Sequence, residues 1–170
     1  MAEPQAKAGD ARIVQLAAFR VGDQEYVIDI MRIREIVNPV KVTAVPGASG
    51  SIEGVINLRG VIIPLVDLRK RFGLPPLDRT RSTKYIIVIV QSRILGVVVD
   101  EVLEVVRVPR ELIKPTPELN ESQEPGMFLG VCQYQERLLL LVNLKKVLSP
   151  AISLAGSTGS GPGPVPAGTR

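Results

Sequence analysis

The chain has 170 residues, 45% of them hydrophobic, with 21 Lys and Arg against 17 Asp and Glu, so its formal net charge is +4. This length predicts one compact domain, or two small ones, with a substantial apolar core. The sequence has no His and a single Cys, Cys132. That excludes a Ser-His-Asp triad, a Cys-His pair, a His-ligated zinc and a disulfide framework. The single Cys and the lack of a signal-peptide pattern predict a reducing, cytoplasmic location.

The charge pattern predicts protein partners and no nucleic acid. Val66–Lys84 carries six basic and two acidic residues, whereas Asp100–Glu124 carries seven acidic and three basic ones. Such mixed patches suit a protein surface better than a phosphate backbone. With aromatic residues at only 4%, there is little for nucleic-acid bases to stack on. The longest apolar run, Tyr85–Val90, is far too short for insertion into a membrane.

In chain order, residues 1–12 are expected to be a flexible N-terminus, and short strands dominate the region between the two ends of the chain. Turn residues between runs of β-branched and aliphatic residues predict hairpins. These hairpins are Leu16–Ile30 with its break at Gly22-Asp23, Gly54–Leu58 with Val61–Val66 around Arg59-Gly60, and Lys84–Val90 with Ile94–Val99.

Two short helices are expected, each after an N-capping residue. Asp67 is expected to cap Leu68–Phe72, and Asn143 to cap Leu144–Leu148, with Pro150 ending the second helix. Gly, Pro and Ser then supply 13 of the 22 residues from Ser149 to the end of the chain. This composition predicts a disordered tail over residues 150–170.

An internal repeat organises the region between the ends. With a shift of 69, residues 16–46 align without a gap on residues 85–115, and with a shift of 76 residues 50–70 align on residues 126–146. The second alignment matches at seven of 21 positions, where chance would give about one or two. Residues 13–149 are therefore expected to form one domain of two repeat-related halves, about 15–83 and 84–149. Such short hairpins are marginal alone, which favours two small barrels with a shared aliphatic interface.

Catalytic chemistry finds little support in the sequence. The carboxylates near predicted strands have no recognised spacing, and no phosphate-binding glycine motif is present. Asp67 and Asp100 are most simply capping or turn residues, and Cys132 is most simply a small buried hydrophobe. A carboxylate metal site or a carboxylate-dependent enzyme stays a minor alternative. The carboxylates considered are Asp29, Glu35, Asp67, Asp100 and Glu104.

Glu35 and Arg59 are the residues most suggestive of a specific partner. The strands of the Arg59 hairpin are repeated in the second half, but Arg59-Gly60 becomes Gln135-Glu136 there. The fold itself therefore does not require Arg at this turn, whereas a partner-specific surface would. Arg suits both bidentate pairing with a carboxylate and anchoring of an interface. Glu35 is either an ordinary exposed charge or the acid paired with Arg59.

Four segments, covering about Ile13 to Leu148, resemble the CheW family of bacterial chemotaxis coupling proteins. The most specific is GVINLRGVIIPLVDLR at residues 54–69, and the others are YVIDI with IREI at residues 26–36, GVVVDEV at 96–102 and LLLVNL at 139–144. The resemblance implies a mostly β fold, with two five-stranded, SH3-like β-barrels on a shared hydrophobic core and short helices. It implies no enzymatic activity and no cofactor or metal.

The resemblance also implies partners and binding residues. The partners would be a CheA-type histidine kinase, contacted through its regulatory domain, the cytoplasmic tips of methyl-accepting chemotaxis receptors, and other copies of the adaptor, all in membrane-bound arrays. Glu35 and Arg59 would form an acid–base pair on the first barrel, and Val99, Val102 and Val105 would line a receptor groove between the barrels. The matched stretch adds Ile33, Gly54 and Asn57.

The sequence therefore predicts a cytoplasmic, non-enzymatic adaptor that couples chemoreceptors to the kinase. The length and the absence of His argue against a kinase of the same pathway, and the tail leaves no room for a receiver domain. An adaptor of the same family in another chemosensory-type pathway, such as surface motility, stays open as the alternative.

Overall fold

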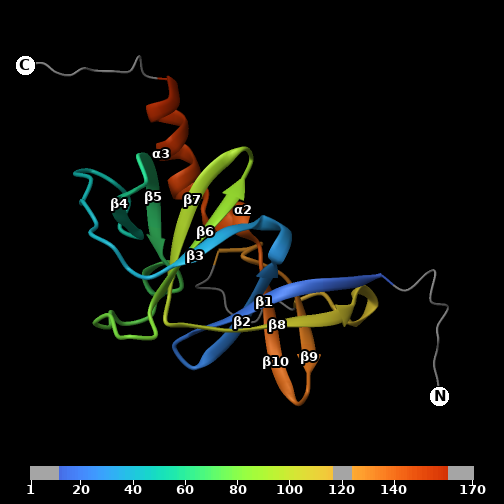
Figure 1. The fold of residues 1–170 in the computed structure, drawn as a ribbon. Coiled ribbons are helices and arrows are strands. Elements are labelled where there is room, and N and C mark those ends of the chain that lie inside the picture. The colour runs from blue at the N-terminus through green and yellow to red at the C-terminus, as the bar shows by residue number, and fades with distance from the viewer. Residues whose placement is uncertain (1–11, 117–123, 161–170) are drawn as a thin grey trace, which may run out of the picture.

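The computed structural model describes residues 12–116 and 124–160, the last six as backbone only, and consists of short strands joined mostly by tight turns (Figure 1). The elements, in order, are β1 (Ile13–Val21), β2 (Gln24–Asp29), the 3-10 helix η1 (Ile30–Arg32), β3 (Ile33–Val37), β4 (Ile52–Leu58), β5 (Val61–Asp67), α1 (Leu68–Arg71), β6 (Lys84–Val90), β7 (Arg93–Val99), β8 (Glu101–Pro109), the 3-10 helix η2 (Arg110–Leu112), β9 (Phe128–Tyr134), β10 (Arg137–Val142), α2 (Leu144–Val147) and α3 (Ser149–Ser160).

The strands form two five-stranded sheets, as the family resemblance implied. Sheet A has the order β8-β1-β2-β10-β9, and sheet B has the order β3-β6-β7-β5-β4. Neighbouring strands are antiparallel except for one parallel pair in each sheet, β2 with β10 in sheet A and β7 with β5 in sheet B. In Figure 1 the labels of sheet B lie in the upper part of the molecule and those of sheet A in the lower part.

Each sheet is built from both halves of the repeat. Sheet A combines β1 and β2 of the first half with β8–β10 of the second, and sheet B combines β6 and β7 of the second half with β3–β5 of the first. The chain crosses from one sheet to the other between β2 and β3, and crosses back between β7 and β8. Because the repeat maps one strand order onto the other, the alignment is confirmed, but a sequence half does not correspond to a barrel.

The ends of each sheet meet through a small bridge. In sheet B, Thr43 and Val55 exchange two backbone hydrogen bonds of 2.8 and 2.9 Å, so the chain after β3 pairs with β4. In sheet A, Lys114 and Val131 do the same at 2.7 and 2.8 Å, so the chain after β8 pairs with β9. The two sheets are thereby closed in the same way.

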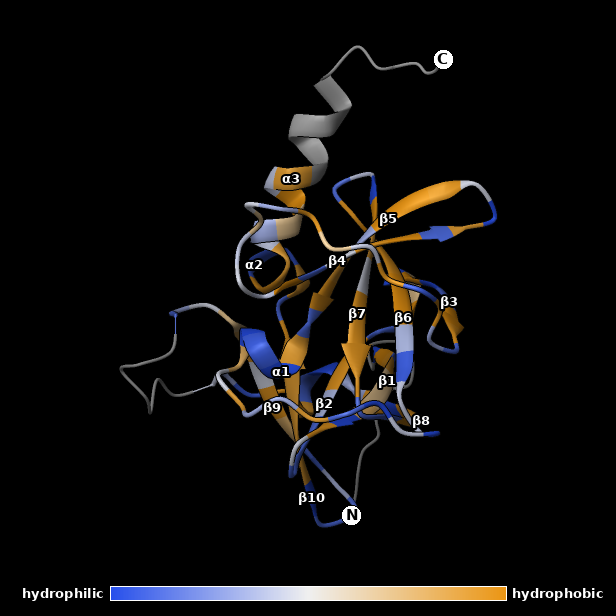
Figure 2. Cartoon of the chain, turned by 90° about the vertical axis from the view of Figure 1, so that its left-hand side faces the viewer, coloured by the Kyte–Doolittle hydropathy of each residue, from blue (hydrophilic) through white to orange (hydrophobic). Residues whose placement is uncertain are grey.

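The central strands have apolar residues on both faces because each face packs in a different core. In β6, Ile86 and Val88 belong to the core shared by the two sheets, whereas Tyr85 and Ile87 belong to the core inside sheet B. Strands buried on both faces read as continuous apolar runs, and Figure 2 shows the central strands mostly in hydrophobic colours and the loops mostly in hydrophilic ones. The shared hydrophobic core predicted from the sequence is therefore confirmed.

An ionic cluster around Asp100 fixes the crossing from β7 to β8. Arg69 donates to Asp100 from Nε at 3.0 Å and from Nη2 at 2.8 Å, and the backbone N–H of Gly22 donates to it at 2.8 Å. Burial opposes ionisation of Asp100, but the bonds from Arg69 and Gly22 outweigh it and lower the pKa of this carboxyl below its ordinary value. Asp100 therefore ties α1 and the β1–β2 turn to the crossing.

The predicted helices α1 and α2 are present with their expected caps, but the disordered tail over residues 150–170 is wrong in its first part. Residues 149–160 form α3, and Ala151 is fully buried in the shared core. Pro150, which was expected only to end the second helix, lies in the first turn of α3, where Pro is tolerated. The averaged composition of the tail concealed the apolar residues Ala151, Ile152 and Leu154, which pack on the core. Residues 161–170 and the predicted N-terminus up to residue 11 lie outside the described residues.

No helix within residues 12–116 and 124–160 has both the length and the apolar character needed to cross a membrane.

Candidate protein-interaction site

The closure of sheet B brings Glu35 and Arg59 together. Glu35 lies on β3 and Arg59 at the tip of the β4–β5 hairpin, and these are the strands at the two ends of the sheet order. The guanidinium of Arg59 donates a hydrogen bond to the Glu35 carboxylate. The pair predicted from the sequence is therefore present, although it lies in the sheet that also contains β6 and β7.

The hairpin turn presents the Arg59 side chain to solvent. Arg59 has φ +53° and Gly60 has φ +88°, as a tight two-residue turn between twisted strands requires. The Asn57 Oδ1 accepts a hydrogen bond of 2.8 Å from the backbone N–H of Gly60. Asn57 thus holds the turn, and the Arg59 side chain is left 68% exposed.

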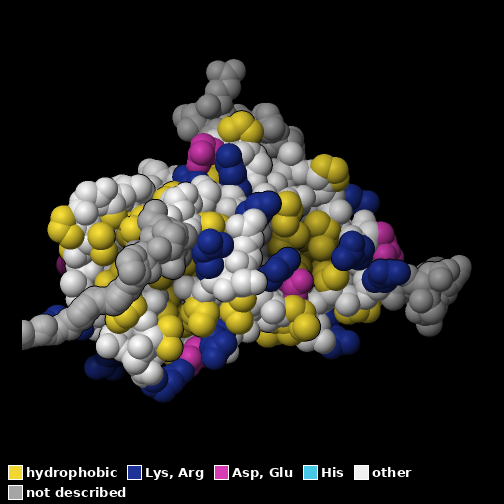
Figure 3. Space-filling view, turned by 90° about the horizontal axis from the view of Figure 1, so that it is seen from above, with side chains coloured by type: hydrophobic (Ala, Val, Ile, Leu, Met, Phe, Trp, Pro, Cys, Tyr) yellow, Lys and Arg dark blue, Asp and Glu magenta, His cyan; other side chains and the backbone are white. Residues whose placement is uncertain are grey.

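Apolar surface surrounds this pair. Ile36 on β3 and Val61 and Ile62 on β5 are exposed, and a groove of about 430 Å³ runs beside the hairpin between β4, β5, the β6–β7 turn and Leu154 of α3. Figure 3, which looks onto this end of the molecule, shows hydrophobic and basic side chains side by side with few acidic ones. A charged anchor beside apolar side chains is the composition typical of a protein interface.

The repeat provides an internal control for this site. Glu104 is the counterpart of Glu35, but its partner is Arg137 within β10, at 2.8 Å. Arg137 also donates to Glu25 at 2.9 Å and lies over the Tyr134 ring. Those contacts hold Arg137 in the fold, whereas Arg59 has one carboxylate partner among the described residues and its more exposed side chain is free to meet another molecule.

Two other residues predicted for this site, Gly54 and Ile33, contribute to the fold itself. Gly54 lies where the closing segment crosses β4, and a Cβ there would come within 2.3 Å of the Thr43 carbonyl oxygen. At its repeat counterpart Gly130, a Cβ would come within 2.7 Å of the Lys114 carbonyl oxygen. Ile33 is partly buried and packs against the shared core. Closure of the sheets thus explains why glycine occurs at both positions.

The predicted groove residues of the second half differ widely in exposure. Val99 is fully buried in the shared core, so its assignment to an exposed groove is wrong. The family resemblance implied that assignment, whereas β7 is covered on both faces, by the shared core and by the core inside sheet B. Val102 is partly buried against the same core, and Val105 is 54% exposed on β8 of sheet A.

The remaining carboxylates considered for catalysis are engaged in the fold. Asp29 and Asp67 cap η1 and α1 through hydrogen bonds of 2.9 Å to Met31 and Arg69 backbone N–H groups. Burial raises the pKa of Asp67, against the lowering effect of that cap, and burial also raises the pKa of the Cys132 thiol. A buried thiol with a raised pKa is unreactive, as expected for a core residue.

Sequence reasoning missed the exposed apolar residues beside the turn. It assigned Val61–Val66 to a strand without distinguishing its ends, but Val61 and Ile62 are 44% and 59% exposed while Ile63–Asp67 are buried. The place of these two residues directly after the turn could have revealed their exposure, because residues next to a two-residue turn project beyond the neighbouring strands.

Comparisons with known proteins agree with this architecture. Residues 15–151 match the CheW-like domain family. The chain is 37% identical over 141 residues to a probable chemotaxis protein CheW of Rhizobium etli, covering 83% of this chain and 91% of that protein. It is 30% identical to Protein FrzA of Myxococcus xanthus over 89% of this chain and 96% of that one. The crystal structure of the scaffolding protein TtCheW of Thermoanaerobacter tengcongensis superposes with a TM-score of 0.75 at 29% identity, covering 81% and 93% of the two chains. The chain belongs to the CheW-like family and is a chemotaxis adaptor of that family.

Proposed function

We propose that this adaptor couples a CheA-type histidine kinase to chemoreceptor tips in the cytoplasm, without catalysing a reaction itself. The observation that carries the proposal is the exposed Arg59–Glu35 pair beside the apolar groove of the β4–β5 hairpin. An Arg that is already paired with an acid, and flanked by exposed aliphatic residues, offers a preorganised anchor for the regulatory domain of the kinase.

The receptor surface is proposed to lie on the other sheet. Val105 is exposed on β8, and Val102 on the same strand is only partly buried. Ile33 follows the crossing between the sheets, so these residues flank the boundary between sheets A and B. Separate surfaces allow one adaptor to hold both partners, and weak individual contacts, including those with other copies, become strong when many are linked in an array.

Gel filtration with the regulatory domain of a CheA kinase from the same organism tests the kinase contact. We expect a complex that Arg59→Ala weakens and that Gln135→Ala, at the equivalent turn of the second half, leaves unchanged. A complex insensitive to Arg59→Ala would remove this hairpin from the interface, and no complex with any chemotaxis kinase would overturn the coupling role.

The second candidate is the same adaptor role in another chemosensory-type pathway, such as surface motility. The match to Protein FrzA, a relative that is not named as a chemotaxis protein CheW, supports this second candidate. Parallel binding measurements against the kinases of each such pathway in the organism would decide, because only the cognate regulatory domain should bind tightly.

A further inference from the structure

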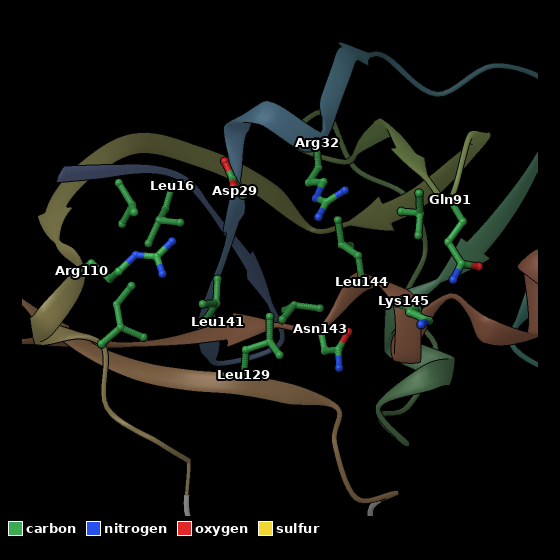
Figure 4. A pocket seen from close by; sticks show the side chains of 14 residues that line it. Leu16, Asp29, Arg32, Gln91, Arg110, Leu129, Leu141, Asn143, Leu144 and Lys145 are labelled. Carbon is green, nitrogen blue, oxygen red and sulfur yellow. The ribbon is translucent and has the colours of Figure 1, made fainter. Parts of the chain in front are cut away.

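A second hollow, distinct from the groove at Arg59, lies at the end of sheet A beside α2. It has a volume of about 510 Å³ and is bordered by β1, β10, η1, η2, the β6–β7 turn and the start of α2. Its apolar lining includes Leu16, Leu129, Leu141 and Leu144. Figure 4 shows these side chains around the hollow, with Leu129 and Leu141 below it.

The rim of the hollow is basic. Arg32 of η1, Arg110 of η2 and Lys145 of α2 line it, and Asp29 is the one carboxylate among the lining residues. Figure 4 shows Arg32 and Arg110 directed over the hollow from different sides. Among the described residues, none of these three cations forms an ion pair, and the Asp29 carboxylate already caps η1. The hollow therefore carries a positive excess that the described part of the chain does not neutralise.

The repeat shows what occupies the equivalent place in the other sheet. Shifts of 69 and 76 map Lys145 onto Arg69, Gln91 onto Gly22 and Met31 onto Asp100. At the first place the Asp100 carboxylate accepts bonds from Arg69 and from the Gly22 backbone, and closes the junction.

At the second place the described part of the chain supplies no such carboxylate. Met31 stands where the acid would be, and it is 84% exposed. Lys145 and Gln91 line the hollow instead. Within residues 12–116 and 124–160, the fold thus repeats the cation and the turn of this junction without the acid that would complete it.

We propose that this hollow binds an acidic side chain, flanked by apolar residues, of a protein partner. The carboxylate would lie between Lys145 and Arg32, as Asp100 lies on Arg69, and the flanking apolar residues would cover Leu129, Leu141 and the exposed thioether of Met31, which adapts well to a partner surface. A protein segment is favoured because Asp100 is itself presented by a stretch of polypeptide, at the junction between β7 and β8. The inference rests on the proposed adaptor function and adds a surface to it.

Binding titrations with two named proteins test the proposal: the kinase regulatory domain and a soluble cytoplasmic fragment of a receptor. The variants are Lys145→Glu and Arg32→Glu, and the matched control is Lys41→Glu, since Lys41 is the repeat counterpart of Arg110 and lies outside the hollow. We expect one of the two complexes to weaken by about tenfold or more with both variants and to be unaffected by the control. Raising the salt concentration from about 0.05 M to about 0.5 M should weaken the binding of the wild-type protein to that partner.

Several outcomes would overturn the proposal. If both complexes keep their affinity within about twofold in the two variants, no partner acid lies in the hollow. If Arg59→Ala still weakens the kinase complex in the same series, the proposed function survives that failure. A second experiment tests whether the hollow binds a small free carboxylate instead of a protein side chain. Octanoate is added while the methyl NMR signals of the lining leucines are followed. Saturable octanoate binding with unchanged protein affinities would make the hollow a small-ligand site. Lys145→Gln and Arg32→Gln repeat the measurement if a Glu variant lowers the melting temperature.

Discussion

The Glu35 carboxylate accepts a hydrogen bond from Arg59 across the seam where the two ends of sheet B are joined. The two residues are 24 positions apart, and the bridge between Thr43 and Val55 makes them neighbours. The same closure in sheet A leaves Glu104 paired with an Arg inside a strand instead. One fold therefore carries a structural version and an exposed version of a single acid–base pair.

Replacing Arg59 should separate binding from stability. Exposed ion pairs contribute about 0–1 kcal/mol, and Arg59 has φ +53°, a conformation that glycine adopts without strain. We expect Arg59→Gly to keep the melting temperature within a few degrees while weakening the kinase complex about tenfold or more. Calorimetric melts and titration calorimetry measure the two effects.

Arg137→Ala is the matched control for this variant. It removes an Arg held by two carboxylates and stacked on Tyr134, so it should lower the free energy of unfolding by about 1–2 kcal/mol and leave kinase binding intact. If Arg59→Gly unfolds the protein instead, the exposed pair is structural and the interface assignment fails.

Gly54→Ala should destabilise the fold severely. The added Cβ would lie 2.3 Å from the Thr43 carbonyl oxygen and 2.8 Å from the Thr43 carbonyl carbon, and Gly54 has φ +149°. The Thr43 backbone cannot move away from this Cβ without breaking the bridge to Val55 that closes sheet B. We expect a loss of about 3 kcal/mol or more in urea unfolding. Gly50→Ala serves as the control, since nothing lies within 4 Å of a Cβ there, and a wild-type-like Gly54→Ala would refute the closure role.

Local features of the fold were predictable from sequence because short-range physics determines them. The Gly22-Asp23 and Arg59-Gly60 turns, and the Asp67 and Asn143 caps, each depend on residues within three or four positions of one another. The repeat predicted two similar units by simple comparison of the two halves. These features are present where the sequence placed them.

Features of the fold that depend on contacts between distant parts of the chain were harder to predict from the sequence. No local signal shows that β3 pairs with β6 rather than within its own half, so the exchange of strands between sheets was not predicted. Val99, which the family resemblance placed in a groove, is buried by a second layer contributed from far along the chain. The Glu35–Arg59 pair was inferred because the repeat lacks Arg at the equivalent turn, whereas the basic hollow beside Lys145 needed three-dimensional neighbours from six segments.

Asp100 should make the stability of the fold depend on acidity. Its pKa is lowered in the folded protein from an ordinary value of 3.8, so the folded state binds fewer protons than the unfolded chain. The stabilisation is complete above the unfolded pKa and is lost as the pH falls through the folded pKa.

We expect Asp100→Asn to lower the free energy of unfolding by about 2–3 kcal/mol at neutral pH and to make its decline below about pH 4 shallower than in the wild type. Urea unfolding followed by circular dichroism across this range measures both. Equal slopes in the two proteins would mean that Asp100 gains nothing from Arg69 and Gly22.

Removing α3 should destabilise the domain, although its composition predicted a disordered segment. Ala151 is fully buried, Ile152 and Leu154 pack against the shared core, and α3 lies against β5 and β7. A chain that ends at Leu148 loses this apolar burial, which is worth about 2 kcal/mol or more in unfolding free energy, and uncovers the groove that Leu154 borders. A chain that ends at Ser160 keeps α3 and should melt with the full-length protein. If both truncations melt at the same temperature as the full chain, the contacts of α3 contribute nothing to stability, and the helix is not part of the folded core.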